Sequence, residues 1–122
     1  MSKKILVIDD DDQDRNAMTI ALQRDGYDEV TSAKNGAQGF EIVKSFKPDI
    51  IVIDVVLKDI DGFDLCRQIK LLEGFNGKII MVTGHLDAVN AKKARKSGTD
   101  ELLEKTLDFE NINQTINNLF RQ

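Results

Sequence analysis

The sequence contains few of the residues that build disulfides and zinc clusters. Its 122 residues include one cysteine, Cys66, one histidine, His85, and no tryptophan. A single cysteine excludes an internal disulfide, and one cysteine with one histidine cannot form the thiolate and imidazole clusters that hold zinc. Any metal ion bound by this chain must therefore be held by oxygen atoms.

The chain also lacks an excess of basic residues and a long apolar run. A net charge of −4 argues against nucleic acid as a direct partner, because phosphate binding needs a basic surface. No stretch approaches the ~18 apolar residues of a membrane helix, and the first residues lead directly into a predicted strand without a signal peptide. These absences predict a cytoplasmic protein with neither a membrane partner nor a direct nucleic-acid partner.

Runs of β-branched residues alternate with amphipathic segments along the chain. Strands are predicted at residues 4–8, 29–33, 49–54, 78–82 and 100–104. Helices are predicted at about residues 13–25, 36–47, 62–73, 87–97 and 109–120, with Asp12 capping the first and Asp108 the last. The length suits one domain over residues 1–122. The alternation predicts an α/β fold, a doubly wound parallel sheet with helices on both faces, but does not by itself give the strand order.

Polar residues follow three of the predicted strands. Ile50 to Ile53 has no polar face, which predicts a strand buried on both sides that ends at Asp54. The first predicted strand ends on Asp9 and Asp10, and the fourth ends on Thr83. Ligands of open α/β sheets bind at the carboxyl ends of central strands. We therefore expect these side chains to meet at one edge of the sheet.

The three carboxylates of Asp9, Asp10 and Asp54 are candidate ligands for a magnesium ion. Mg²⁺ prefers oxygen ligands and binds through a few carboxylates while keeping waters that a phosphate can replace. Acidic residues also favour the start of a helix, so the run beginning at Asp9 could simply be solvated. A calcium loop starting at Asp10 is excluded, because its sixth position would be Arg15 instead of glycine.

Thr83 and Lys105 are candidate anion contacts. Thr83 precedes Gly84 at a strand end, and Lys105 lies just past the fifth predicted strand. Taken singly, the first is an ordinary β-branched strand terminus and the second an ordinary surface charge. Their positions at the carboxyl ends of separate strands place a hydroxyl and an ammonium near the acidic residues.

Motifs after four of the predicted strands resemble the receiver domain of two-component response regulators. They are Ile8 to Asp11, Asp54 with Leu57 and Asp61-Gly62-Phe63, Thr83-Gly84, and Gly98 to Lys105. The resemblance covers essentially the whole chain. It implies a flavodoxin-like, five-stranded sheet in the order 2-1-3-4-5, as in chemotaxis regulators. It also implies a single receiver domain with no output domain in these residues, so that the chain either acts through protein contacts or is a fragment of a longer regulator.

The resemblance implies a phosphorylation site that depends on Mg²⁺. Asp54 would be the nucleophile that takes a phosphoryl group from a phosphohistidine. Asp10, Asp54 and the backbone carbonyl of Val56 would bind Mg²⁺ directly, and Asp9 would act mainly through a bound water. The chain would catalyse only its own phosphorylation and dephosphorylation, and would not be an enzyme in the usual sense.

The resemblance also implies how the site signals. Lys105 would neutralise phosphoryl oxygens, and Thr83 would move to hydrogen-bond the new phosphate. That movement would shift the surface made by the fourth helix, the fifth strand and the fifth helix. The implied partners are a histidine kinase or phosphotransfer protein and a downstream protein target. The chain would act as a monomer or a phosphorylation-dependent dimer.

Three positions depart from the usual receiver pattern. Lys58 replaces a common proline, which predicts a less constrained loop and adds a charge near the site. Thr106 replaces another proline that usually follows a cis bond; before a non-proline residue that bond costs about 3 kcal/mol, so the Lys105–Thr106 bond is either trans or strained. Leu102 replaces an aromatic ring that couples the site to the output surface, so this coupling is in question here.

Two other functions are compatible with parts of the pattern. The fold could serve as an unphosphorylated docking module, a pseudo-receiver, although the full set of reactive residues is present. A phosphatase that forms an aspartyl phosphate generally needs a second Asp two residues after the nucleophile, and Val56 stands there. His85 has two interpretations, a residue beside the path of the hydrolytic water or an exposed loop residue without a role. Cys66 is expected to be a small packing residue.

Overall fold

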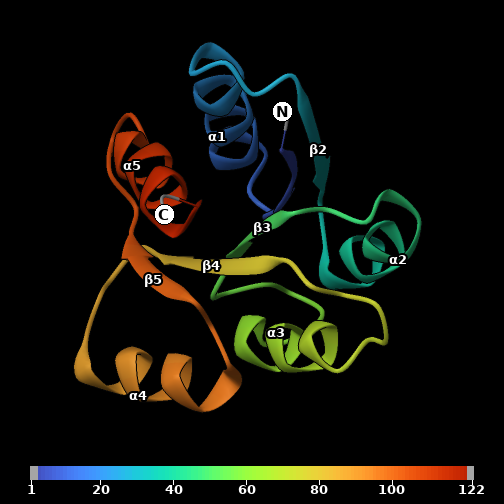
Figure 1. The fold of residues 1–122 in the computed structure, drawn as a ribbon. Helices are drawn as coiled ribbons and strands as arrows, with labels where there is room; N and C mark the ends of the chain where they lie inside the picture. Colours follow the sequence, from blue (N-terminus) through green and yellow to red (C-terminus); the bar gives the residue numbers. More distant parts are fainter. Residues whose placement is uncertain (1–2, 121–122) are drawn as a thin grey trace.

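The computed structural model describes residues 3–120, which form one parallel sheet with the strand order β2-β1-β3-β4-β5 (Figure 1). The strands are β1 (Lys4–Ile8), β2 (Glu29–Ala33), β3 (Ile50–Asp54), β4 (Lys78–Thr83) and β5 (Glu101–Glu104). The helices are α1 (Asp12–Arg24), α2 (Gly36–Phe46), α3 (Gly62–Lys70), α4 (Ala88–Ser97) and α5 (Glu110–Phe120). The predicted fold class and strand order are confirmed.

Helices cover both faces of the sheet, with α1 and α5 on one face and α2, α3 and α4 on the other (Figure 1). All five residues of β3 are buried. Because strand side chains alternate between faces, Ile51 and Ile53 pack in the core beneath α3, whereas Ile50 and Val52 pack beneath α1 and α5. The strand that ends in Asp54 is therefore fixed by cores on both sides.

The helix boundaries differ from the predicted ones at three places. Asp11, not Asp12, caps α1, and its side chain accepts a hydrogen bond from the backbone N–H of Asp14. Consecutive carboxylates can each serve as a cap, so the sequence leaves the exact start open. Helix α3 ends at Lys70, earlier than predicted, with Leu71 as its C-cap.

The third difference lies before α5. Phe109 has a left-handed backbone conformation, with φ 54°, and so lies outside the helix that begins at Glu110. Its side chain is nevertheless buried, and the Asp108 carboxylate accepts a hydrogen bond from the Glu110 N–H. The residue predicted to lie on the inner face of the helix thus reaches the same core from the preceding turn.

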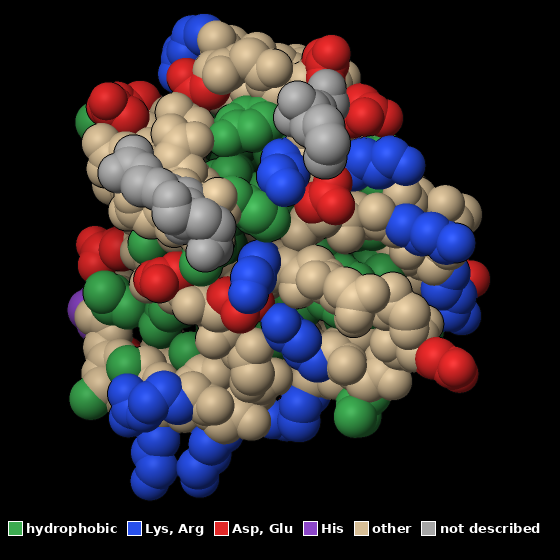
Figure 2. Space-filling model, in the orientation of Figure 1, with side chains coloured by type: hydrophobic (Ala, Val, Ile, Leu, Met, Phe, Trp, Pro, Cys, Tyr) green, Lys and Arg blue, Asp and Glu red, His purple; other side chains and the backbone are tan. Residues whose placement is uncertain are grey.

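Basic side chains are concentrated on one helix. Lys and Arg side chains gather over α4 (Figure 2), whose Lys92, Lys93, Arg95 and Lys96 are all exposed. The first turn of α1, by contrast, carries Asp12 and Asp14. The region after β1 is therefore acidic because these residues are clustered there, in addition to the net negative charge of the chain. Within residues 3–120, no helix is long and apolar enough to cross a lipid bilayer.

Candidate functional site

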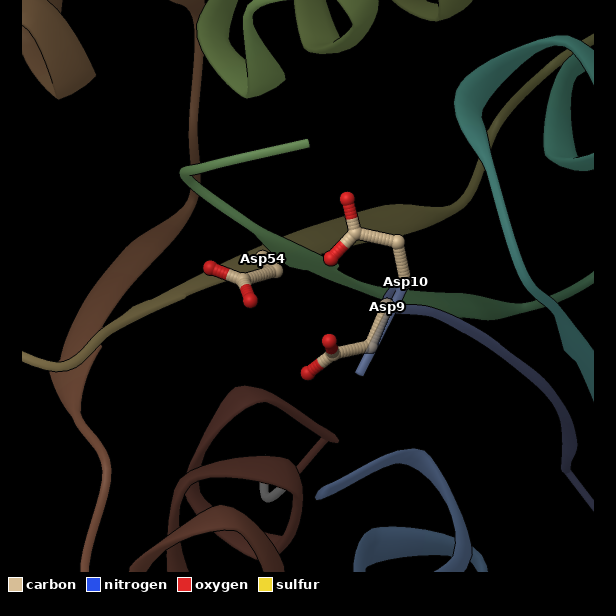
Figure 3. A group of neighbouring side chains, drawn as sticks. All are labelled: Asp9, Asp10 and Asp54. Atoms are coloured by element: carbon tan, nitrogen blue, oxygen red, sulfur yellow. The ribbon is translucent and has the colours of Figure 1, made fainter. Parts of the chain in front are cut away.

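Asp9, Asp10 and Asp54 meet where β1 and β3 end (Figure 3). One carboxylate oxygen from each lies within 4.8 Å of the others, which is close enough for one ion to contact all three. Asp9 is fully buried, and 7% of the surface of Asp54, counted over the whole residue, is exposed. The side-by-side pairing of the two strands produces this convergence, as the sequence predicted.

Lys105 binds three carboxylates from one side of this cluster. Its Nζ lies 3.0 Å from Asp9 Oδ2, 2.9 Å from Asp54 Oδ2 and 2.7 Å from Asp14 Oδ2. The backbone explains its position, because the Lys105 N–H donates to the Thr83 carbonyl and extends the pairing of β4 with β5. One ammonium thus faces three negative charges, and the site retains a surplus that favours a cation.

The burial of this cluster changes the proton affinities of its members. The pKa of Asp9 is raised to about 6, first by burial and then by the nearby negative charge of Asp54, although the hydrogen bond from the Asp11 N–H and the contact with Lys105 act in the opposite direction. Burial would lower the pKa of Lys105, but its hydrogen bonds to Asp14, Asp54 and Asp9 outweigh this effect and raise it. Lys105 therefore stays charged in the neutral pH range.

The loop between β3 and α3 is held by hydrogen bonds on both sides of the site. The Val56 N–H donates to Asp54 Oδ1 at 3.0 Å, and the Lys58 N–H donates to Asp10 Oδ2 at 2.8 Å. Further along, Asp59 accepts hydrogen bonds from the first N–H groups of α2, which lower its pKa. The loop predicted to be less constrained at Lys58 is thus tied down, and it is the backbone N–H, which proline lacks, that provides the bond to Asp10.

Thr83 lies at the same edge of the sheet but points its hydroxyl into the loop before α4. Its Oγ1 donates to the His85 carbonyl at 3.1 Å and accepts from the His85 N–H at 3.2 Å. The Asn90 side chain on α4 also reaches Thr83 Oγ1, at 3.5 Å, and donates to the His85 carbonyl at 3.0 Å. In this state the Thr83 hydroxyl therefore contacts the β4–α4 loop and α4.

The structure also shows the surroundings of the other residues that the sequence singled out. No peptide bond in the described part of the chain is cis, so the Lys105–Thr106 bond is trans, and Lys105 still reaches Asp54. Leu102 is partly buried against the core. The His85 side chain is 83% exposed. Cys66 is fully buried beside Ser97 and Thr99, and burial raises the pKa of its thiol, as suits a packing residue.

Two residues of this edge had no signal in the sequence. Asp14 contacts Lys105, and Asn90 contacts the loop that holds Thr83. Both are polar residues in the first turn of a helix, where such residues are common for other reasons. Only the three-dimensional arrangement distinguishes them.

The sequence matches the response regulator receiver domain family over residues 5–117. It is 32% identical to the transcriptional regulatory protein AfsQ1 of Streptomyces coelicolor, over 97% of this chain and 51% of that protein. It is 30% identical to the alkaline phosphatase synthesis transcriptional regulatory protein PhoP of Bacillus subtilis, over 100% of this chain and 50% of that protein. The chain thus spans about half the length of these relatives.

Solved structures share the fold. The chemotaxis protein CheY4 of Vibrio cholerae superposes with a TM-score of 0.91 at 22% identity, covering 98% of this chain and 100% of that chain. The response regulator TrrA of Thermotoga maritima, solved in complex with Mg(2+)-BeF, has a TM-score of 0.85 at 25% identity, covering 97% of this chain and 99% of that chain. Receiver domains are signalling modules and not classical enzymes. With the family match spanning nearly all of its residues, this chain belongs to the response regulator receiver domain family.

Proposed function

We propose that the chain is a phospho-acceptor module that receives a phosphoryl group on Asp54 from a histidine kinase or a phosphotransfer protein. The observation that carries this proposal is the arrangement around Asp54. Its carboxylate shares a 4.8 Å cluster with Asp9 and Asp10, and Lys105 Nζ lies 2.9 Å from its Oδ2. A nucleophile, a cation site and a fixed positive charge then surround one point at the sheet edge.

The proposed reaction transfers the phosphoryl group between two side chains. A carboxylate oxygen of Asp54 forms the new P–O bond, and the P–N bond to the histidine of the donor breaks, its electron pair leaving with the ring nitrogen. Lys105 neutralises negative charge on the transferred oxygens, for which its position beside Asp54 is suited. Phosphoryl transfer needs mainly positioning and electrostatic stabilisation, and this chain's fixed side chains can supply both.

The donor set fits Mg²⁺. The Asp9, Asp10 and Asp54 carboxylates, with the backbone carbonyl of Val56, would hold it, because hard divalent cations prefer such oxygen ligands. Bound there, the ion would neutralise phosphoryl oxygens together with Lys105. That TrrA, which shares this fold, was solved in complex with Mg(2+)-BeF supports a magnesium ion as the ligand of this chain.

Phosphorylation would be reported through Thr83. To donate a hydrogen bond to a phosphoryl oxygen, its hydroxyl must give up the bond that it donates to the His85 carbonyl. That change would shift the balance of conformations of the β4–α4 loop and of the surface formed by α4, β5 and α5. Because Leu102 stands where many receivers have an aromatic ring, we expect the loop and α4 to carry the signal to a downstream protein.

The upstream and downstream partners follow from the same assignment. The relatives AfsQ1 and PhoP are named transcriptional regulatory proteins, and this chain matches about half of each. The residues described here would act by protein contacts, as a monomer or a phosphorylation-dependent dimer, in the cytoplasm where histidine kinases donate. The net charge of −4 supports the absence of a direct nucleic-acid contact by these residues.

The test is phosphorylation of the purified chain by acetyl phosphate with Mg²⁺, read by intact mass. One added phosphoryl group in the parent, absent from Asp54→Asn and abolished by chelating the metal, is the expected result. A known receiver labelled in parallel controls the reagent. A folded parent that gains no mass while this control is labelled would contradict the proposal and favour an unphosphorylated docking module.

A further inference from the structure

Asp14 is bound to the residue that would neutralise the phosphoryl group. It lies in the first turn of α1, and its Oδ2 is 2.7 Å from Lys105 Nζ. This contact is shorter than those of Lys105 to Asp9, at 3.0 Å, and to Asp54, at 2.9 Å. The shortest ion pair of Lys105 is thus with a residue outside the proposed metal cluster.

The three contacts use every N–H of the Lys105 ammonium group. An ammonium carries three donors, and those of Lys105 go to Asp9, Asp14 and Asp54. The Lys105 side chain is 16% exposed, so little solvent competes for them. An incoming phosphoryl oxygen can gain a hydrogen bond from Lys105 only if one of these carboxylates gives one up.

Asp14 is the carboxylate that can give up its contact at least cost. Its side chain is 37% exposed, against 0% for Asp9 and 10% for Asp54. Asp9 is also held through its other oxygen by the Asp11 N–H, and Asp54 by the Val56 N–H. Water can hydrate the Asp14 carboxylate when it separates from Lys105, whereas a buried carboxylate would lose its partner without that compensation.

We infer that Asp14 is a positioning residue that holds Lys105 in the unphosphorylated state and, by its negative charge, lowers the affinity of the site for a phosphoryl group on Asp54. The inference rests on the proposed function. Two effects act in the same direction, because Asp14 competes for Lys105 and its charge repels the phosphoryl oxygens. Affinity for the phosphoryl group is then set partly by a residue that is neither the proposed nucleophile nor a proposed metal ligand.

Asp14→Asn separates the charge from the contact. Asparagine keeps an oxygen that can accept from Lys105 but carries no charge. Removing this partly exposed negative charge should tighten binding of the phosphoryl group by about two- to fivefold, the size of effect that solvent-screened charges have on one another. Asp14→Glu retains the charge and should bind the phosphoryl group with affinity similar to the parent.

Asp12→Asn is the matched control. Asp12 lies in the same turn of α1 and carries the same charge, but its side chain is 80% exposed and pairs with Arg15. Its substitution changes the net charge of the chain and the charge of the first turn of α1 as much as Asp14→Asn does, but it leaves the three carboxylates around Lys105 unchanged. An effect confined to Asp14→Asn therefore reports the negative charge beside Lys105.

The experiment is a titration of the full chain with beryllofluoride at saturating Mg²⁺, followed by ¹⁹F NMR, for the parent and the three variants. The unfolding free energy of each is measured in parallel, because a purely structural role would change stability and leave the beryllofluoride affinity unaltered. Tighter binding by Asp14→Asn alone, with parent-like binding by Asp14→Glu and Asp12→Asn, is the expected result. Equal affinities for Asp14→Asn and Asp12→Asn, or weaker binding by Asp14→Asn, would overturn the inference while leaving the proposed function intact. A parent that binds no beryllofluoride would overturn both.

Discussion

Asp9 is the residue whose environment most changes its chemistry. It is fully buried, and its pKa is raised to about 6 from an ordinary 3.8. A carboxyl whose folded pKa is raised contributes stability below its unfolded pKa, and this contribution is lost as pH rises through the folded value. In the absence of a divalent ion, ionised Asp9 therefore opposes folding above pH 6.

Asp9→Asn should consequently be more stable, relative to the parent, at higher pH. In EDTA, we expect the unfolding free energy of the variant, relative to the parent, to increase between pH 4 and pH 6 by about 1–3 kcal/mol and to level off above. Urea unfolding at a series of pH values measures this difference, in which the other titrating groups largely cancel. A difference that stays constant across this pH range would show that Asp9 titrates normally.

Lys105 supplies a positive charge to Asp9 and Asp54, and a bound metal ion could replace this charge. Lys105→Gln leaves the buried Asp9 beside Asp54 without a cation and should lower the metal-free unfolding free energy by about 3 kcal/mol. Mg²⁺ restores a positive charge to the same carboxylates, so it should stabilise the variant more than the parent. Thermal unfolding with EDTA and with Mg²⁺ tests this. The control is Lys92→Gln on the exposed surface of α4. Equal stabilisation of Lys105→Gln and the parent by Mg²⁺ would contradict the expectation.

The sequence predicted the residues of this cluster that directly follow strands. It did not predict the residue that reaches the cluster from a helix. Asp9, Asp10 and Asp54 converge because parallel strands deliver their carboxyl ends to one edge. Lys105 has the same origin, since its N–H continues the β4–β5 pairing. Asp14 reaches the site from the first turn of α1, and that depends on how the helix packs, which no periodicity specifies.

At the scale of the elements, the β3–α3 loop is fixed by a backbone group that a proline would lack. Lys58→Pro removes the N–H that holds Asp10 Oδ2, whereas Lys58→Ala keeps it. We expect the proline variant to bind Mg²⁺ several-fold more weakly, because a hydrogen bond that orients a metal ligand is lost. The alanine variant removes a nearby positive charge and should bind Mg²⁺ at least as tightly as the parent. Calorimetric titration measures the Mg²⁺ affinity of the two variants, and equal affinities would contradict the role assigned to this N–H.

Helix α3 begins against the backbone of the site. A Cβ on Gly62 would lie 2.4 Å from the Asp54 carbonyl oxygen and 2.8 Å from that of Val55, and neither can swing aside as a side chain could. Gly62→Ala should therefore lower the unfolding free energy by about 1–3 kcal/mol and displace the loop that carries Val56.

Gly84→Ala is the comparison for this prediction. No atom lies within 4 Å of the Cβ that would be added at Gly84, so its unfolding free energy should change by about 0.5 kcal/mol or less. Urea unfolding of both variants measures the difference. If Gly62→Ala proved as stable as Gly84→Ala, the close approach of α3 to β3 would not constrain the loop.

Element identity followed from sequence pattern, whereas element boundaries depended on tertiary contacts. The continuous apolar run of β3 was sufficient to place a strand, and the helices predicted from about residues 36 and 87 begin within one residue of α2 and α4. The start of α1 was displaced because several adjacent carboxylates compete to cap it. Phe109 was assigned to the last helix because an apolar residue there fits the helical spacing; in the structure it is buried, but its backbone is left-handed.

At the scale of the whole molecule, alternation of strands and helices predicted the layers but not the strand order. The order came from the family resemblance, and the structure confirms it. Physically, β1, β3 and β4 occupy the centre because their runs are apolar on both faces. By contrast, the residues of β2 and β5 are mostly exposed or partly buried, which suits strands at the edges. This burial contrast was present in the sequence and could have ranked the strands by centrality.

The same contrast predicts where the molecule opens most easily. Strand β5 has four residues and pairs with β4 alone, whereas β3 pairs on both sides and is buried throughout. Amides of β1, β3 and β4 should therefore exchange with solvent only on global unfolding, and those of β5 through smaller openings at lower free energy. Since Lys105 directly follows β5, the element that positions the proposed phosphoryl contact is also one of the least protected. Hydrogen exchange followed by mass spectrometry in native buffer, with peptides that resolve β3 from β5, measures the exchange rates of the two strands. Exchange of β5 as slow as that of β3 would mean that the sheet opens only as a unit, and that mobility at β5 plays no part in relaying the state of the site.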